Sequence, residues 1–177
     1  MIKKIAIVIA IAIAAILGYA ATRPDDFVVQ RSITIKATPE KVYPLINDFR
    51  QWAAWSPWEH LDPDMKRTIS GATSGKGAVY EWMSVKDDVG QGRMEITDTT
   101  APYKIQIKLD FIQPWQASNQ AEFTLTPGTD GTQVNWAMIG KSPFMFKVIQ
   151  IFMSMDKMVG KDFEKGLSQM KAVAEKP

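Results

Sequence analysis

Hydrophobic and polar residues alternate along several short segments of the chain. In KIQIKLDF, residues 104–111, Ile105, Ile107, Leu109 and Phe111 fall on one side of an extended chain and polar residues on the other. The same alternation, interrupted by turn-forming residues, predicts β-strands at 27–37, 65–70, 78–85, 92–98, 103–111, 120–126 and 132–140. The close spacing of these strands indicates an antiparallel sheet with one apolar face.

Two other segments carry hydrophobic residues at helical spacing. Thr38-Pro39 is a typical helix start, and the hydrophobic residues from Val42 to Phe49 recur every three or four positions. After Ser142-Pro143 a longer pattern predicts one helix over 144–174, with the recurring residues Phe144, Val148, Phe152, Met155, Val159, Phe163, Leu167 and Met170. We expect this long C-terminal helix to cover the apolar face of the sheet.

The N-terminal segment differs from the rest of the chain. From Ile5 to Ala21 there is no charged residue, and Lys3 and Lys4 precede this run. As a helix the run would be about 25 Å long, near the lower limit for crossing a bilayer. We therefore expect residues 1–22 to form a transmembrane anchor and residues 23–177 to form a separate domain.

The two lysines also indicate how such an anchor would be oriented. Basic residues stay preferentially in the cytoplasm, so we expect a single-pass inner-membrane protein with its C-terminal domain in the periplasm of a bacterial cell. A cleaved signal peptide, with Gly18-Tyr19-Ala20 as the cleavage site, is the alternative and would release the domain into the periplasm. A third interpretation is a helix buried within a soluble protein. It would need surrounding protein on every side, and this short chain has little to provide.

Composition excludes several classes of function. Charged residues make up 23% and hydrophobic residues 46% of the chain, as in ordinary globular proteins. Outside the N-terminal segment the basic and acidic side chains balance, so nothing points to nucleic-acid binding. The absence of cysteine excludes a thiolate nucleophile, a disulfide and a sulfur-ligated metal site. We expect no cofactor.

The order of the predicted elements and several short stretches resemble one protein superfamily. The stretches are RSITIKATPEKVYPLINDFRQWAAWSPW, AVYEW, GRMEIT, GTQVNWAMIG and MDKMVGKDFEKGLSQMK, which together cover nearly all of residues 27–172. They resemble the START/Bet v 1-like (SRPBCC) superfamily, in particular its polyketide cyclase/dehydrase and lipid-transport branch. The resemblance implies an α+β helix-grip fold, in which a curved antiparallel sheet of about seven strands surrounds the long C-terminal helix. It also implies an apolar cavity between helix and sheet, in a family whose members mostly bind hydrophobic small molecules and only sometimes catalyse.

The segment QWAAWSPWEH, residues 51–60, contains three of the six tryptophans of the chain. Under the resemblance it lies near one end of the cavity, and two interpretations stay open. The indoles either close the end of a filled core or form the mouth of a ligand pocket. Together with inward-facing positions on the strands and the closing helix, the candidate ligand-binding residues are Trp52, Trp55, Trp58, Tyr80, Trp82, Met94, Ile96, Val134, Trp136, Met138, Met155 and Val159.

His60 is the only histidine and follows Glu59 directly. Next to a carboxylate it is a weak candidate for a general base, but it is equally compatible with an exposed loop residue. No serine stands in an elbow-like sequence and no cysteine exists for it to activate, so we assign no catalytic residue. The segment EHLDPD offers one imidazole and three carboxylates at no spacing typical of zinc or calcium, and we expect no metal site.

Three functions remain compatible with the sequence. The pattern favours a membrane-anchored domain that binds or carries a hydrophobic small molecule or lipid in its cavity. A structural or interaction module would instead have a filled core and an exposed patch for an unknown protein partner. An enzyme of the cyclase, dehydratase or hydrolase type would need His60 or an acid pointing into the cavity.

Overall fold

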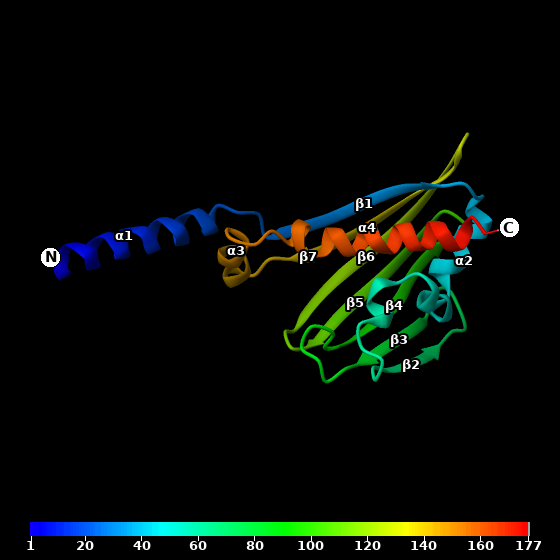
Figure 1. Ribbon diagram of the computed structural model, residues 1–177, viewed down its shortest axis with the longest axis horizontal. Coiled ribbons are helices and arrows are strands. Elements are labelled where there is room, and N and C mark those ends of the chain that lie inside the picture. Colours follow the sequence, from blue (N-terminus) through cyan, green and yellow to red (C-terminus); the bar gives the residue numbers. More distant parts are fainter. Residues whose placement is uncertain (177) are drawn as a thin grey trace.

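Seven strands form a single antiparallel sheet in the order β1-β7-β6-β5-β4-β3-β2. This computed structural model describes residues 1–176 and is shown in Figure 1. All the predicted strands are present, each within a few residues of the expected position. Their bounds are β1 Asp26–Ile35, β2 Lys66–Gly71, β3 Ala78–Met83, β4 Gln91–Thr100, β5 Lys104–Gln113, β6 Ala117–Gly128 and β7 Gly131–Lys141.

Most of the helices lie on one face of this curved sheet, whereas the N-terminal helix extends away from it and the short helix of residues 144–150 lies beside the end of the N-terminal helix (Figure 1). Their bounds are α1 Ile2–Ala21, α2 Pro39–Asn47, the 3₁₀ helices η1 Phe49–Ala54 and η2 Pro57–His60, α3 Phe144–Gln150 and α4 Met155–Ala174. α4 packs along β1 and the concave face of the sheet, so the architecture is the α+β helix-grip fold that the sequence predicts.

The expected single helix over 144–174 is wrong in one respect, because the chain breaks it at 151–154. α3 ends in a tight turn, in which the amides of Phe152 and Met153 donate to the carbonyl of Ile149. Ser154 then takes an extended conformation, φ −74° and ψ 129°, and becomes the N-cap residue of α4. The predicted apolar stripe is buried on α4 but not before it, since Phe144 and Phe152 are 46% and 72% exposed.

The sheet register places several chain segments at one end of the domain. Asp26 pairs with Lys141, and Gly140 pairs with Asn119. The start of β1 therefore lies beside the end of β7 and the start of β6, and the antiparallel pairing continues to the end of β5 and the start of β4. We call this end, where α1 joins β1, the α1 end of the sheet. The first turns of α4 lie there too, since Asp156 pairs with Arg31 of β1.

The opposite half of the domain is a solid hydrophobic core. Here α2 and the second half of α4 pack on the sheet, and the buried side chains include Ile35, Ile96, Ile105, Ile107, Leu125, Val134, Leu167 and Met170. α1 takes no part in this core, because Ala20 is its only buried residue. At 20 residues and with a mean hydropathy of 2.3, α1 is long and apolar enough to cross a membrane.

Candidate functional site

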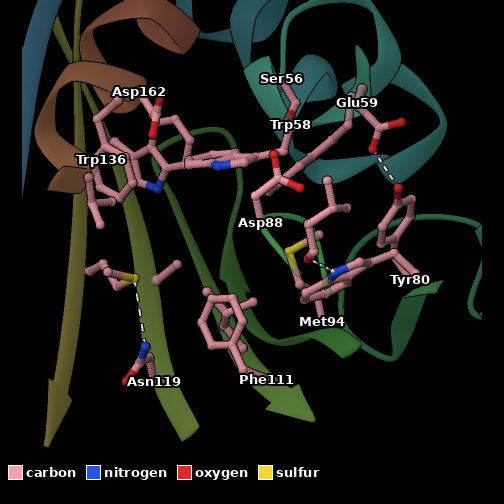
Figure 2. Close-up of a pocket in the computed structure, with 18 of the residues that line it drawn as sticks. Ser56, Trp58, Glu59, Tyr80, Asp88, Met94, Phe111, Asn119, Trp136 and Asp162 are labelled. Carbon is pink, nitrogen blue, oxygen red and sulfur yellow. Dashed lines mark hydrogen bonds between the residues drawn. The ribbon is translucent and has the colours of Figure 1, made fainter. Parts of the chain in front are cut away.

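A cavity of about 270 Å³ separates α4 from the sheet at the α1 end of the domain. Its walls come from η1 and η2, from the inward faces of β3 to β7, and from the first half of α4. Most of the side chains around it are aromatic or aliphatic (Figure 2). The rim includes the loop that joins β3 to β4 and the first turns of α4, where the lining residues Asp88 and Met155 are not fully buried; we call this part of the rim the mouth.

Most of the candidate residues from the sequence lie on this cavity. Those that line it are Trp52, Trp58, Tyr80, Trp82, Met94, Trp136, Met138, Met155 and Val159. The other three, Trp55, Ile96 and Val134, are at most 1% exposed and belong to the solid core. Ile96 follows Met94 on β4 and Val134 precedes Trp136 on β7, so both lie farther from the α1 end of the sheet than the cavity reaches.

The tryptophan segment thus contains residues of both kinds. Trp55 packs edge-on against Phe123 and Trp136, and its indole N–H donates to the carbonyl of Leu45 at 2.8 Å. Trp52 lines the cavity but is also tied down, by a 3.0 Å bond to the carbonyl of Ile46. Trp58, which is only partly buried, forms a wall of the cavity. The two interpretations thus apply to different residues of one segment: Trp55 closes the core, and Trp58 forms a wall of the cavity.

Trp136 presents a buried polar group without a partner. Its ring is stacked between Phe163, 4.0 Å away between centroids, and Phe123, 4.9 Å away. Within residues 1–176 its indole nitrogen has no hydrogen-bond acceptor, and Figure 2 shows this nitrogen on the edge of the ring that faces the other lining residues. An unpaired buried N–H costs about 1–3 kcal/mol. The ring is therefore held rigidly beside the cavity, with an N–H that is unpaired and itself closed off from solvent.

A second polar group closes one side of the cavity. Glu59 of η2 is 6% exposed. One of its carboxylate oxygens accepts a 2.5 Å bond from the Tyr80 hydroxyl, drawn in Figure 2, and the other accepts a 2.7 Å bond from Nε of Arg67. Both oxygens are engaged within the protein, so this carboxylate anchors η2 to β2 and β3 and is not free to act on a ligand.

The rim of the cavity is acidic. Asp88 lies on the loop between β3 and β4, and Asp162 lies on α4. In the part of the chain that the structure describes, neither carboxylate forms an ion pair. Two unpaired carboxylates at a mouth repel an anionic group that approaches it.

The local sequence explains why the Trp82 ring can lie flat in the wall. Gly92, its cross-strand neighbour on β4, has no side chain. A Cβ atom at that position would lie 2.2 Å from the Trp82 ring and 2.6 Å from the carbonyl oxygen of Asp110. Trp82 also donates from its indole N–H to the carbonyl of Val89 at 3.2 Å, which links the wall to the loop at the mouth.

His60 lies outside the cavity. Its side chain is exposed, and Nε2 lies 3.0 Å from the carbonyl oxygen of Ala53. The nearby carboxylate of Asp62 is buried instead, where it accepts bonds from the Ser84 hydroxyl and from the Asp64 amide. Between residues 1 and 176 no cluster of side chains is suited to hold a metal ion. The histidine and the acids of EHLDPD therefore do not form one site.

Several lining residues were not among the sequence candidates. For Leu109, Phe111 and Phe163 a signal existed, since all three lie on the apolar faces that the alternation and the helical spacing predict. For Glu59, Asp88 and Asp162 no pattern in the sequence distinguishes them from surface acids. Their place in the site depends on how η2, the loop between β3 and β4, and α4 pack around the cavity.

The buried Tyr80 hydroxyl leads to a testable pH dependence. Burial and the bond to Glu59 both raise the pKa of Tyr80 above its ordinary value. The unfolded chain releases this proton near pH 10. The stability that Tyr80 contributes is therefore complete below about pH 10 and is lost as the pH rises above it. We expect urea unfolding of Tyr80→Phe to show a smaller loss of stability between pH 9 and about pH 11 than the wild type. Equal losses of stability in the variant and the wild type over this pH range would contradict a raised pKa for Tyr80.

Comparison with known proteins gives one family and a consistent fold. The model of the family "Polyketide cyclase / dehydrase and lipid transport" matches residues 26–175. No curated protein matches the chain. Among solved structures, a protein from Chromobacterium violaceum superimposes with a TM-score of 0.59 at 16% identity, over 87% of this chain and 100% of its own.

Two further structures have the same fold. A Staphylococcus aureus protein of unknown function superimposes with a TM-score of 0.60 at 15% identity, over 85% of this chain and 94% of its own. The di-domain ARO/CYC StfQ from the steffimycin biosynthetic pathway gives a TM-score of 0.66 at 11% identity, over 85% of this chain and 51% of its own. At such low identity these similarities concern the fold alone.

Proposed function

The chain belongs to the polyketide cyclase/dehydrase and lipid transport family, and on that premise we propose that its cavity binds a hydrophobic small molecule or lipid. The observation that carries the proposal is an apolar cavity of about 270 Å³ whose wall holds the unpaired donor of Trp136. A filled core, as expected for a purely structural module, would leave no such space.

The dimensions and charges of the cavity narrow the class of ligand. About 270 Å³ lies just below the usual range of small-molecule sites, about 300–1,000 Å³. This space suits one acyl or isoprenoid chain, or a small ring system, rather than a whole two-chain lipid. A ligand with a hydrogen-bond acceptor would satisfy the N–H of Trp136 after a small shift of the ring, and the rim carboxylates Asp88 and Asp162 disfavour a negative charge. The proposed ligand is therefore neutral and apolar, with one acceptor such as a carbonyl or ether oxygen.

The membrane placement is part of the same proposal. α1 is exposed along nearly its whole length and packs on no core, which supports an anchor formed by residues 1–22 and a ligand-binding domain formed by residues 23–177. With Lys3 and Lys4 on the cytoplasmic side, the domain would lie in the periplasm of a bacterial cell. An apolar ligand of low solubility would then be available directly from the bilayer.

A matched pair of fluorescent probes tests the binding proposal. N-phenyl-1-naphthylamine is neutral, and 8-anilinonaphthalene-1-sulfonate has the same two ring systems with an added negative charge. We expect residues 23–177 to take up one neutral probe per chain, with energy transfer from the cavity tryptophans and at least about tenfold tighter binding than the sulfonate. Equal binding of both would contradict the charge argument, and no saturable uptake of either would contradict the ligand site.

A further inference from the structure

The surface of residues 144–153, FMFKVIQIFM, is unusually apolar. Met145 and Met153 are 66% and 52% exposed, comparable with Phe144 and Phe152 of the same segment. Lys147 is its only charged residue, and this side chain is buried, where it forms an ion pair with Asp25. The segment, which we call the α3 patch, thus exposes large hydrophobic side chains and no charge, as a surface does when another apolar phase covers it.

The location of the α3 patch indicates which phase covers it. α3 packs against α1, and the two lie side by side at the same end of the domain in Figure 1. The junction is held by the Lys147–Asp25 pair and by the Ser142 amide, which donates to the carbonyl of Asp25 at 2.7 Å. Asp25 lies four residues beyond Ala21, the last residue of α1, so a bilayer that α1 crosses would end next to α3. The apolar patch is thus continuous with the proposed membrane segment.

The α3 patch is also continuous with the mouth of the cavity. Phe152 and Met153 lie three and two residues before Met155, which lines the cavity, and the sheet register places the cavity at the α1 end. Trp115, on the turn between β5 and β6 at this same end, is 73% exposed. Exposed tryptophan is a residue typical of membrane–water interfaces.

We propose that the α3 patch lies in the surface layer of the same bilayer that α1 crosses and holds the cavity mouth against the lipid. This inference rests on the proposed anchoring by α1 and extends it to the direction from which ligand enters. A ligand would pass between bilayer and cavity over Phe152, Met153 and Met155 without crossing bulk water. The side chains are disposed as in an interfacial amphipathic helix, with Lys147 turned inward to Asp25 and the apolar residues turned outward.

The chain's lack of cysteine makes a direct test possible. Single variants Met145→Cys and Phe152→Cys, each labelled with the polarity-sensitive fluorophore NBD, report on the α3 patch in the full-length chain. Thr129→Cys, on the turn between β6 and β7 at the opposite end of the sheet, is the matched control. Each protein is placed in phosphatidylcholine nanodiscs with and without doxyl-labelled lipid. All three sites are exposed, so the labels leave the core intact.

We expect blue-shifted emission at 145 and 152 and a loss of about half of it with doxyl lipid, with neither effect at 129. Emission at 145 and 152 that matches the control, in chains that do enter nanodiscs, would overturn this inference and leave the anchor intact. A blue shift without doxyl quenching would also overturn it, because it would indicate a protein or a second copy over the patch. Chains that fail to enter nanodiscs would refute the α1 anchor itself, whereas uptake of the neutral probe by residues 23–177 tests the ligand site separately.

Discussion

Replacement of Glu59 by alanine should lower the free energy of unfolding by about 3 kcal/mol, the largest stability effect that we expect from a single change around the cavity. The loss arises because Tyr80, 4% exposed, would lose its acceptor and Arg67, one-third exposed, would lose its charged partner, while the guanidinium keeps the carbonyls of Met65 and Glu59. Urea unfolding near pH 7 measures the change. The value lies at the lower end for a broken buried pair, because water can still reach the guanidinium of Arg67.

Glu59→Gln is the matched control for that experiment. The amide keeps one oxygen as an acceptor for Tyr80, and its NH2 group replaces the charged oxygen that accepts from Arg67, which keeps the carbonyls of Met65 and Glu59 as acceptors. We expect a loss of about 1 kcal/mol for this variant. Equal, small losses in both variants would show that Glu59 does not anchor η2, the helix that carries Trp58 of the cavity wall.

Replacement of Ala121 by phenylalanine should abolish uptake of the neutral probe, with an affinity loss of at least about tenfold. Ala121 lines the cavity from β6 and is 6% exposed, so a phenyl ring at this position would occupy much of the 270 Å³. Because the ring enters existing space, the free energy of unfolding should change by no more than about 1 kcal/mol. Titration with N-phenyl-1-naphthylamine and urea unfolding measure the two quantities.

The neighbouring position provides the control. Gln120 precedes Ala121 on β6, and its side chain is exposed on the other face of the sheet. Gln120→Phe adds the same ring to the same strand without entering the cavity, and we expect it to leave probe uptake unchanged. If Ala121→Phe binds the probe as tightly as Gln120→Phe does, the probe binds elsewhere and the cavity is not the site.

The sheet could be predicted well from the sequence because strand alternation is a local property. Ile105 and Ile107 need only a period of two and a nearby turn to be placed on the inner face. The break between α3 and α4 could not be predicted in this way. The helical spacing continues from Phe152 through Met155, so the pattern alone shows no break, and the tight turn at Ile149 and the N-cap at Ser154 are weak local signals.

The candidate site, too, could be predicted from the sequence only in part. Alternation indicates that Met94 and Ile96, or Trp136 and Val134, face inward, but it does not indicate how far along a strand the cavity extends. That depth depends on the register of the sheet and on the place where α4 comes close to it. The buried role of Glu59 depends on η2 meeting Arg67 and Tyr80, two residues of neighbouring strands. Such contacts between distant segments cannot be deduced from the spacing of residues along the chain.

The central claim is that the cavity carries a neutral apolar molecule, and native mass spectrometry of the full-length chain extracted from membranes tests it most directly. We expect a bound molecule in a 1:1 complex, which organic extraction identifies as neutral, with one hydrogen-bond acceptor and a size suited to about 270 Å³. The molecule should be absent from Ala121→Phe and present in Gln120→Phe. A bare polypeptide mass, or the same molecule retained by Ala121→Phe, would contradict the account.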